Sequence, residues 1–223
     1  MLVMASIFRN SESYLWRYFT QVAELREQMP VRLVVAEGDS TDNTYAELEA
    51  ELGKRDTLLK VDHGGPEYGS VDDENRWAQI AYVCNAVLDH LDMRDDDHLI
   101  YVESDLAWPW TTMTRLNADL SVVGAVAAMS FHAHTGKFYD IWGHVGLDGV
   151  PFSRDEPFHD SIARLKPGYL TAIQSAGSCI AVRGEIVNKG IRFSDRDCIR
   201  GFCRDIRDHT ALMLDTGAEV YHP

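Results

Sequence analysis

The first half of the chain alternates short apolar runs with longer segments in which apolar residues recur at helical spacing. The apolar runs predict buried strands, over residues 2–8, 31–36, 58–61 and 99–102. The longer segments predict helices, over residues 12–28, 44–52 and 74–91. A strand–helix alternation that is repeated and then closed by a further strand predicts an α/β fold, in which helices flank both faces of a mostly parallel central sheet.

The second half of the chain is less regular. Its patterns predict helices over residues 111–120 and 197–208, and strands over residues 122–129, 178–182 and 219–222. The segment 131–158 is rich in glycine, histidine and aromatic residues, which is typical of a long functional loop. Because we find no repeat, low-complexity tract or linker, we predict a single domain with two halves, residues 1–110 and 111–223.

Composition disfavours some classes of partner. The 223 residues include 35 acidic and 21 basic side chains, a net charge of −14. This balance disfavours non-specific binding to nucleic acid or to an anionic membrane, although it leaves room for a local basic patch. We find neither an apolar run of about 20 residues nor a signal peptide, and the four cysteines show no CxxC spacing. We therefore expect a cytoplasmic protein with reduced thiols and no stable membrane insertion.

Two carboxylates follow the fourth predicted strand. Glu103 and Asp105 are separated by one residue, and residues i and i+2 of an extended segment point to the same side. They would face one spot beyond the carboxyl end of the strand, where open α/β sheets bind ligands. Mg²⁺ and Mn²⁺ bind carboxylate and phosphate oxygens, so the pair fits a divalent cation on a phosphorylated ligand. The same residues could instead cap the following helix.

Polar residues also follow the first two predicted strands. Arg9 and Asn10 come after the first strand, and the acidic stretch 37–42 comes after the second. Parallel strands would bring these groups to the edge that holds Glu103 and Asp105, where like charges repel unless a cation or a hydroxyl-rich ligand joins them. The sequence contains neither GxGxxG nor GxxxxGK(S/T), so neither a dinucleotide-binding fold nor a P-loop is indicated.

Together, Arg9-Asn10, the stretch 34–44 and Glu103-Ser104-Asp105 resemble the nucleotide-sugar-binding half of GT-A-fold glycosyltransferases of the family 2 kind. In such enzymes the second strand typically ends in an acidic Gly/Ser-Thr-Asp stretch. A later strand ends in an Asp-x-Asp (DXD) motif, which holds the metal on the nucleotide diphosphate. The resemblance covers residues 2–110 well and the rest more loosely. It implies a GT-A fold with a nucleotide-sugar-binding first half and an acceptor-binding second half. It also implies a metal-dependent glycosyltransferase, with Mn²⁺ or Mg²⁺ as cofactor and a UDP- or GDP-sugar as donor.

The resemblance implies roles for individual residues. Glu37 and Asp39 would contact the base and the ribose, and Arg9 would lie near the nucleotide. Arg76, on the helix after the 63–73 loop, would lie near the base or the diphosphate, although a charge on a solvated helix face would look the same. The 63–73 loop has the glycines, proline and charges of a mobile segment, and we expect it to close over the donor.

At the metal site, the resemblance implies Asp105 as a ligand. Glu103 would take the place of the first Asp of the motif and reach the ribose or the metal. Many metal-dependent members supply a histidine from the C-terminal strand, which makes His222 a further candidate ligand. Mn²⁺ accepts an imidazole more readily than Mg²⁺ does. Taken by itself, a histidine at this position is typical of an exposed surface residue.

The catalytic base is harder to place. The segment 201–207 resembles the helix that follows a catalytic acidic pair in many inverting members, but Cys198 and Ile199 stand where that pair would fall. The nearest carboxylates are Asp197 and Asp195. We take Asp197 as the first candidate for the base that deprotonates the acceptor hydroxyl and Asp195 as the second. Asp197 would serve nearly as well as a helix N-cap, and a retaining enzyme would need no such base.

The aromatic run Phe138-Tyr139-Asp140-Ile141-Trp142 leaves two interpretations open. It is faintly similar to a motif of fungal capsule-type mannosyltransferases, and aromatic rings beside a carboxylate suit a sugar ring. It could equally pack a long loop. His132 and His134 have the spacing of metal ligands on a strand, but no third ligand is near them in the sequence.

Two other functions fit parts of the pattern. A sugar-phosphate nucleotidyltransferase uses a similar sheet but opens with a glycine-rich basic loop after the first strand, where this chain has Phe8-Arg9-Asn10-Ser11. A non-catalytic nucleotide- or sugar-binding module would keep the fold without the base. The acceptor stays open, because a glycan, a lipid, a protein, a small molecule and a modified DNA base all fit the sequence.

Overall fold

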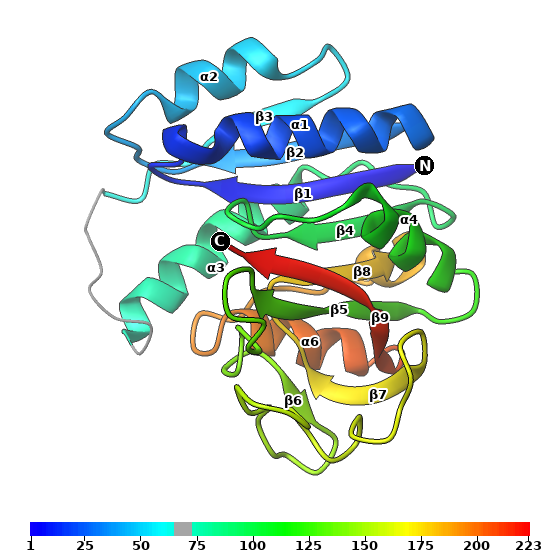
Figure 1. Cartoon of the computed structure of the whole chain (residues 1–223). Helices are drawn as coiled ribbons and strands as arrows, with labels where there is room; N and C mark the ends of the chain where they lie inside the picture. The colour runs from blue at the N-terminus through cyan, green and yellow to red at the C-terminus, as the bar shows by residue number, and fades with distance from the viewer. Residues whose placement is uncertain (65–72) are drawn as a thin grey trace.

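The computed structural model describes residues 1–64 and 73–223, which form a nine-stranded sheet between two layers of helices (Figure 1). The strands are β1 (Leu2–Phe8), β2 (Val31–Glu37), β3 (Thr57–Lys60), β4 (His98–Val102), β5 (Ala125–His132), β6 (Val145–Gly146), β7 (Leu170–Ser175), β8 (Cys179–Arg183) and β9 (Leu212–His222). The helices are α1 (Glu12–Gln28), α2 (Thr44–Glu51), α3 (Glu74–Asp89), α4 (Trp110–Asp119), α5 (Gly184–Val187) and α6 (Ile199–Arg207). None of these described helices is long and apolar enough to cross a membrane.

The strands lie in the order β3-β2-β1-β4-β8-β5-β9-β7-β6. The pairs among β3, β2, β1 and β4 are parallel, and so is the pair of β5 with β9. β8 is antiparallel to both of its neighbours, and β7 is antiparallel to β9 and to β6. Every described strand except β7 and β8 therefore runs in the same direction, which confirms the predicted α/β fold with a mostly parallel sheet. We call the end of the sheet to which these strands point the carboxyl edge; it lies at the left of Figure 1.

Both faces of the sheet are apolar because successive side chains of a strand point to opposite sides. In β1, Leu2 and Met4 pack into the core under α1, α2 and α4, whereas Val3 and Ala5 pack into the core under α3, α5 and α6. In Figure 1, α1 and α4 lie in front of the sheet, and α3 and α6 lie behind it. Burial on both faces explains why β1 has a continuous apolar run instead of an alternating pattern.

The second half of the chain departs most from the sequence prediction. β1 and α1 have the predicted bounds, but β7 and α5 are not predicted and β9 begins well before residue 219. β7 is partly exposed and near the far end of the sheet, so it lacks the continuous apolar run of a buried strand. The segment 131–158 is irregular, as predicted, apart from the end of β5 and the two residues of β6. Of the loop expected over 63–73, residues 65–72 lie outside the described residues.

Two loops of the carboxyl edge are joined by hydrogen bonds. Asn10, in the turn between β1 and α1, accepts a hydrogen bond from the Thr41 amide at 2.8 Å. Asp42, in the loop between β2 and α2, accepts hydrogen bonds from the amides of Glu12 at 3.2 Å and Thr44 at 3.0 Å. Because Glu12 and Thr44 are the first residues of α1 and α2, one carboxylate satisfies N–H groups of two helices.

Replacing Asp42 by alanine should lower the free energy of unfolding by about 1 kcal/mol, the usual cost of losing a capping side chain. Burial would raise the pKa of Asp42, but the hydrogen bonds from Thr44 and Glu12 outweigh it and lower the pKa, so the ionised form is the one the fold prefers. Urea-induced unfolding at neutral pH measures the difference. Glu49→Ala, at an exposed position of α2, is the matched control. Equal stability of the two variants would contradict the capping role.

Candidate active site

The carboxyl edge collects several residues that the sequence singles out. Glu37, the last residue of β2, is buried, and its Oε1 accepts a hydrogen bond from the Ser40 amide at 2.6 Å. Asp39 follows with a left-handed backbone (φ 53°), and its partly exposed carboxylate accepts a hydrogen bond from the His63 amide at 2.7 Å. Arg9 lies half-buried in the neighbouring turn after β1. Glu37 thus supports the loop, and Asp39 and Arg9 lie partly exposed beside it.

Glu103 and Asp105 lie in the loop that follows β4, and two backbone contacts fix this loop. The Glu103 amide donates to the Ser178 carbonyl at 2.9 Å, which continues the pairing of β4 with β8. Ala107 and Tyr221 exchange backbone hydrogen bonds of 2.7 and 2.8 Å. The loop that carries both carboxylates is therefore attached to the end of β9.

This attachment brings His222 next to Asp105. Nε2 of His222 lies 3.2 Å from Oδ2 of Asp105, and the two side chains are 27% and 40% exposed, respectively. The imidazole stacks on the ring of Tyr139, with 4.0 Å between ring centroids and 15° between the planes. The ring of His132 lies edge-on to the imidazole at 5.9 Å. A carboxylate and an imidazole are thus held side by side with access to solvent.

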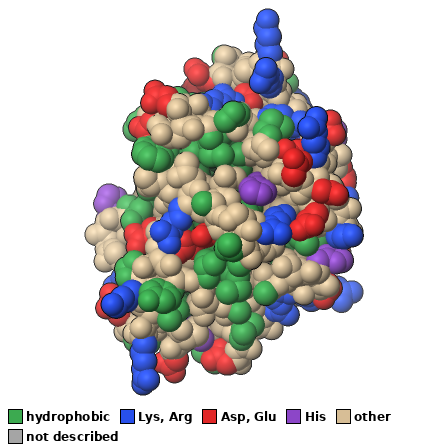
Figure 2. Space-filling view, turned by 90° about the vertical axis from the view of Figure 1, so that its right-hand side faces the viewer, with side chains coloured by type: hydrophobic (Ala, Val, Ile, Leu, Met, Phe, Trp, Pro, Cys, Tyr) green, Lys and Arg blue, Asp and Glu red, His purple; other side chains and the backbone are tan. Residues whose placement is uncertain are grey.

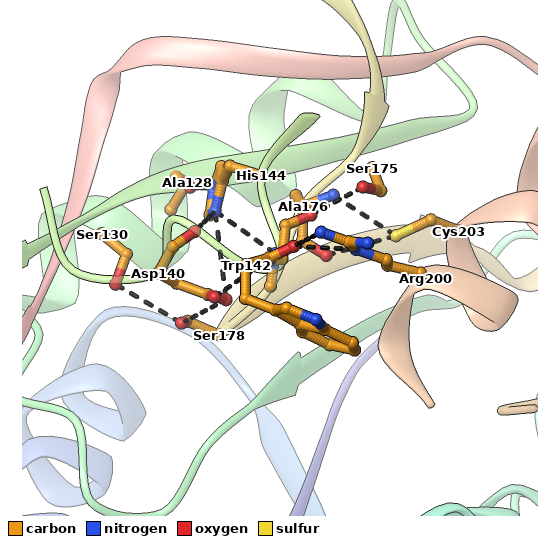
Figure 3. A network of polar contacts seen from close by, with 12 residues as sticks. Ala128, Ser130, Asp140, Trp142, His144, Ser175, Ala176, Ser178, Arg200 and Cys203 are labelled. Carbon is orange, nitrogen blue, oxygen red and sulfur yellow. Dashed lines mark hydrogen bonds and ion pairs between the residues drawn. The ribbon is translucent and has the colours of Figure 1, made fainter. Parts of the chain in front are cut away.

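A further carboxylate, that of Asp140, follows Tyr139 in the loop after β5 (Figure 3). Its Oδ1 accepts a hydrogen bond from the Gly143 amide at 2.7 Å, and its Oδ2 accepts one from the Ser178 hydroxyl at 3.3 Å. The Ser178 hydroxyl is also 3.4 Å from the hydroxyl of Ser130. The sequence predicts only sugar binding or loop packing for this residue, and the aromatic run around it is the available signal.

Negative charges crowd around Glu103. Burial, followed by the charges of Asp105 and Asp140, raises the pKa of Glu103 well above its usual value. Arg76, on α3, is close enough for its positive charge to offset part of this increase. The charge of Arg76 therefore reaches the carboxylate of Glu103 from α3. A crowded acidic cluster of this kind favours a bound cation.

The described residues do not form a complete metal site on their own. Across residues 1–64 and 73–223, no group of three or more His, Cys, Asp or Glu side chains is placed to hold a metal ion. The pair of Asp105 and His222 nevertheless suits Mn²⁺, which accepts both carboxylate and imidazole ligands. Mg²⁺ and Mn²⁺ also commonly fill their remaining positions with water and substrate phosphate. The residues present therefore fit a divalent cation that binds together with a phosphorylated ligand.

The two predicted bases have a different setting. Asp197 accepts hydrogen bonds from both terminal nitrogens of Arg204, at 2.8 and 3.3 Å. Burial would raise the pKa of Asp197, but Arg204, Ser194 and Arg200 outweigh it and lower the pKa. Asp195 is exposed. The role of either residue as the base stays a prediction, and the ion pair with Arg204 makes Asp197 a weaker proton acceptor.

His144 is fully buried under the loop that carries Asp140. Its Nε2 lies 3.1 Å from the Ala128 carbonyl, and its Nδ1 lies 3.1 Å from the Asp140 carbonyl (Figure 3). Burial lowers the pKa of His144, although the nearby Asp140 carboxylate acts in the opposite direction. The imidazole therefore connects the loop to β5.

The opposite edge of the sheet has a different character. Figure 2, which shows the molecule from that side, has acidic and basic side chains interspersed with apolar ones. A hollow of about 390 Å³ lies there, with Val122, Arg183 and Glu185 in its lining. Arg183 and Glu185 approach each other at 3.4 Å. Paired charges at this edge contrast with the acidic cluster at the carboxyl edge, so we place the candidate active site at the latter.

Solved structures with the same fold include proteins crystallised with nucleotide sugars. Residues 1–349 of S. aureus TarS match with a TM-score of 0.62 and 14% identity, over 99% of this chain and 59% of that chain. TarS 1–349 in complex with UDP-GlcNAc matches with a TM-score of 0.58 and 16% identity, over 99% and 57%. The mannosyltransferase PcManGT from Pyrobaculum calidifontis, in complex with GDP-Man and Mn²⁺, matches with a TM-score of 0.60 and 15% identity, over 99% and 56%.

These likenesses concern the fold. At 14–16% identity they confirm the predicted glycosyltransferase fold of the GT-A kind and assign no activity. This chain spans less than two thirds of the length of each of these proteins, from 56% to 59%. No family model matches the chain, and no curated protein sequence matches it.

The buried imidazole of His144 should make stability depend on pH. Because its pKa is lowered in the folded protein, its contribution is present above the unfolded value of about 6.5 and is lost as the pH falls below it. One such group changes the free energy of unfolding by at most about 1.4 kcal/mol per pH unit. Urea-induced unfolding at several pH values between about 7.5 and 5 measures this slope, and His144→Gln should flatten it.

His134→Gln, which removes an exposed imidazole from the same half of the chain, is the matched control. The difference between the two variants isolates the effect of burying His144. A slope that is as steep in the His144 variant as in the His134 variant would show that another group causes the pH dependence.

Proposed function

We propose that this chain is a metal-dependent glycosyltransferase, which moves a sugar from a UDP- or GDP-sugar to an acceptor hydroxyl. One observation carries the proposal: Asp105 and His222 lie 3.2 Å apart at the carboxyl edge, within the acidic cluster that includes Glu103. Such a pair suits a divalent cation that also binds a diphosphate. The likeness in fold to a mannosyltransferase crystallised with GDP-Man and Mn²⁺ supports the same class of donor.

The nucleoside of the donor would lie against the loops after β1 and β2. Asp39 offers a partly exposed carboxylate there, and together with Glu37 it would hydrogen-bond the base and the ribose. Glu37 also supports this loop through the Ser40 amide. Arg9, in the adjacent turn, would add a positive charge near the nucleotide.

The diphosphate would lie at the end of β4. A bound Mn²⁺ or Mg²⁺ would neutralise the charge that develops on the leaving diphosphate. Asp105 and His222 would hold the cation, and Glu103 would bind the cation or a ribose hydroxyl. Arg76 would place a positive charge near the leaving group, since its charge already lowers the pKa of Glu103.

Two alternatives receive less support. A nucleotidyltransferase would need a glycine-rich loop after β1, but the turn there holds Asn10, whose left-handed backbone (φ 49°) takes the place of a glycine. A non-catalytic binding module is the second candidate, because the predicted base Asp197 is engaged by Arg204. Metal-dependent release of nucleoside diphosphate from a nucleotide sugar would exclude such a module.

Nucleotide sugars should stabilise the protein in a metal-dependent way. A ligand that binds only the native state adds about 2.7 kcal/mol to the free energy of unfolding at about 100 times its Kd. A thermal-shift screen of GDP-Man and UDP-GlcNAc, each with and without Mn²⁺, measures the effect. Asp105→Asn should remove the shift that depends on Mn²⁺ and leave the melting temperature of the ligand-free protein unchanged, because the side chain is 40% exposed.

Asp160→Asn, at an exposed aspartate, is the matched control and should keep the full shift. An equal shift with and without Mn²⁺ would disprove the metal dependence. The absence of a shift with either nucleotide sugar, with Mn²⁺ present, would disprove the proposed donor class.

A further inference from the structure

The proposed transfer needs a group that accepts the proton of the acceptor hydroxyl. Cys198 stands where the resemblance expects an acidic pair, and burial together with the charge of Glu103 raises the pKa of its thiol to about 12. At neutral pH this thiol is protonated and cannot act as a base. Asp197, the preceding residue, is bound by Arg204 at 2.8 and 3.3 Å. These two positions therefore offer no free proton acceptor.

We propose that Asp140 is the catalytic base, an assignment that rests on the proposed function. The O–H bond of the acceptor breaks, Oδ2 of Asp140 takes the proton, and the hydroxyl oxygen forms the new bond to the anomeric carbon. The bond from the anomeric carbon to the diphosphate oxygen breaks, and its electron pair leaves with the nucleoside diphosphate. A single displacement of this kind inverts the configuration of the anomeric carbon.

Asp140 is connected to the proposed diphosphate site by one residue. The Ser178 hydroxyl donates to Oδ2 of Asp140 at 3.3 Å, while the Ser178 carbonyl accepts a hydrogen bond from the Glu103 amide at 2.9 Å. Tyr139, which precedes Asp140, stacks on His222 of the proposed metal site. Asp140 is thus next to the groups that would hold the donor, where a base for the attacking hydroxyl has to be.

The carboxylate of Asp140 is oriented through one oxygen and bound more weakly through the other. The Gly143 amide donates to Oδ1 at 2.7 Å, which fixes the side-chain rotamer. The hydrogen bond that Oδ2 accepts from Ser178 is long, at 3.3 Å, and Nδ1 of the buried His144 lies 4.0 Å from the same oxygen. The side chain as a whole is 16% exposed, and an acceptor hydroxyl would be a further donor to Oδ2. A Cβ atom on Gly177 would overlap Oδ2, so glycine at this position leaves the space that the carboxylate occupies.

The loop around Asp140 is anchored on both sides. The Trp142 carbonyl accepts a hydrogen bond from Nε of Arg200 at 2.8 Å, and the Trp142 ring lies 5.1 Å from that of Trp77. His144 connects the same loop to β5 (Figure 3). A base held in this way keeps its position when a substrate binds, as general-base catalysis requires. The rings of the residues around Asp140 are occupied within the fold, because Tyr139 stacks on His222 and Trp142 packs against Trp77 and Arg200.

Two substitutions separate a catalytic role of Asp140 from a structural one. Asn in its place keeps the Oδ1 acceptor for the Gly143 amide but cannot take a proton, whereas Glu can take a proton but is longer by one methylene. The readouts are the Mn²⁺-dependent release of GDP from GDP-Man and of UDP from UDP-GlcNAc, with water as acceptor, and the Kd of each donor by calorimetry. Asp140→Asn should slow release at least about 100-fold with Kd unchanged, and Asp140→Glu should retain more activity than Asp140→Asn.

The opposite order of activity, with Asn active and Glu inactive, would show that Asp140 only holds the turn at Gly143, and it would overturn the assignment. Loss of release in Asp197→Asn, together with normal release in Asp140→Asn, would show that Asp197 is the base.

Asp160→Asn is again the matched control, because this side chain is exposed. A wild-type protein that releases no nucleoside diphosphate from either donor would overturn the proposed function and this assignment with it. Normal release by Asp140→Asn would overturn the assignment alone.

Discussion

The crowding of carboxylates at the carboxyl edge is the constraint on which the rest of the site depends. Glu103 and Asp105 follow β4 and Asp140 follows β5, and their mutual proximity adds to burial in raising the pKa of Glu103. Like charges in loops would move apart if the loops were free to do so. The backbone must therefore hold them together. Arg76 offsets only part of the repulsion, which leaves a demand for a cation that a metal-bound diphosphate would meet.

Two backbone contacts keep the loop after β4 in place, and both involve strands from late in the chain. The Glu103 amide reaches the Ser178 carbonyl because β8 lies between β4 and β5 and runs antiparallel to both. Ala107 pairs with Tyr221 because the end of β9, which pairs with β5 up to His222, also reaches the loop after β4. The position of His222 beside Asp105 is a consequence of the second contact. The order of the strands thus determines which side chains meet at the site.

Local patterns in the sequence predict those parts of the structure that depend on neighbouring residues. β1 and α1 have the predicted bounds because a continuous apolar run and a helical period are local signals, whereas the partly exposed β7 lacks such a run. Glu103 and Asp105 lie beyond the end of β4, with Ser104 and Asp105 in a turn, so the period of two of an extended strand does not determine how their side chains point. The approach of His222 to Asp105, and of Asp140 to Glu103, depends on the order β4-β8-β5-β9, and no local pattern contains that information.

Hydrogen-bond partners separate the acidic residues of these loops into two groups. Asp42 accepts hydrogen bonds from the amides of two helices and Asp197 from Arg204, and in both cases these bonds lower the pKa against the effect of burial. Carboxylates bound in this way support the fold and are poor proton acceptors. Asp105 and Asp140 have no arginine partner of this kind: a histidine lies beside the first, and the second has a glycine amide, a distant serine hydroxyl and the His144 ring at 4.0 Å. All four are acidic residues in loops, and the sequence alone does not distinguish them. The hydrogen-bond partners thus separate the acids that support the helix ends and Arg204 from those that face the proposed site.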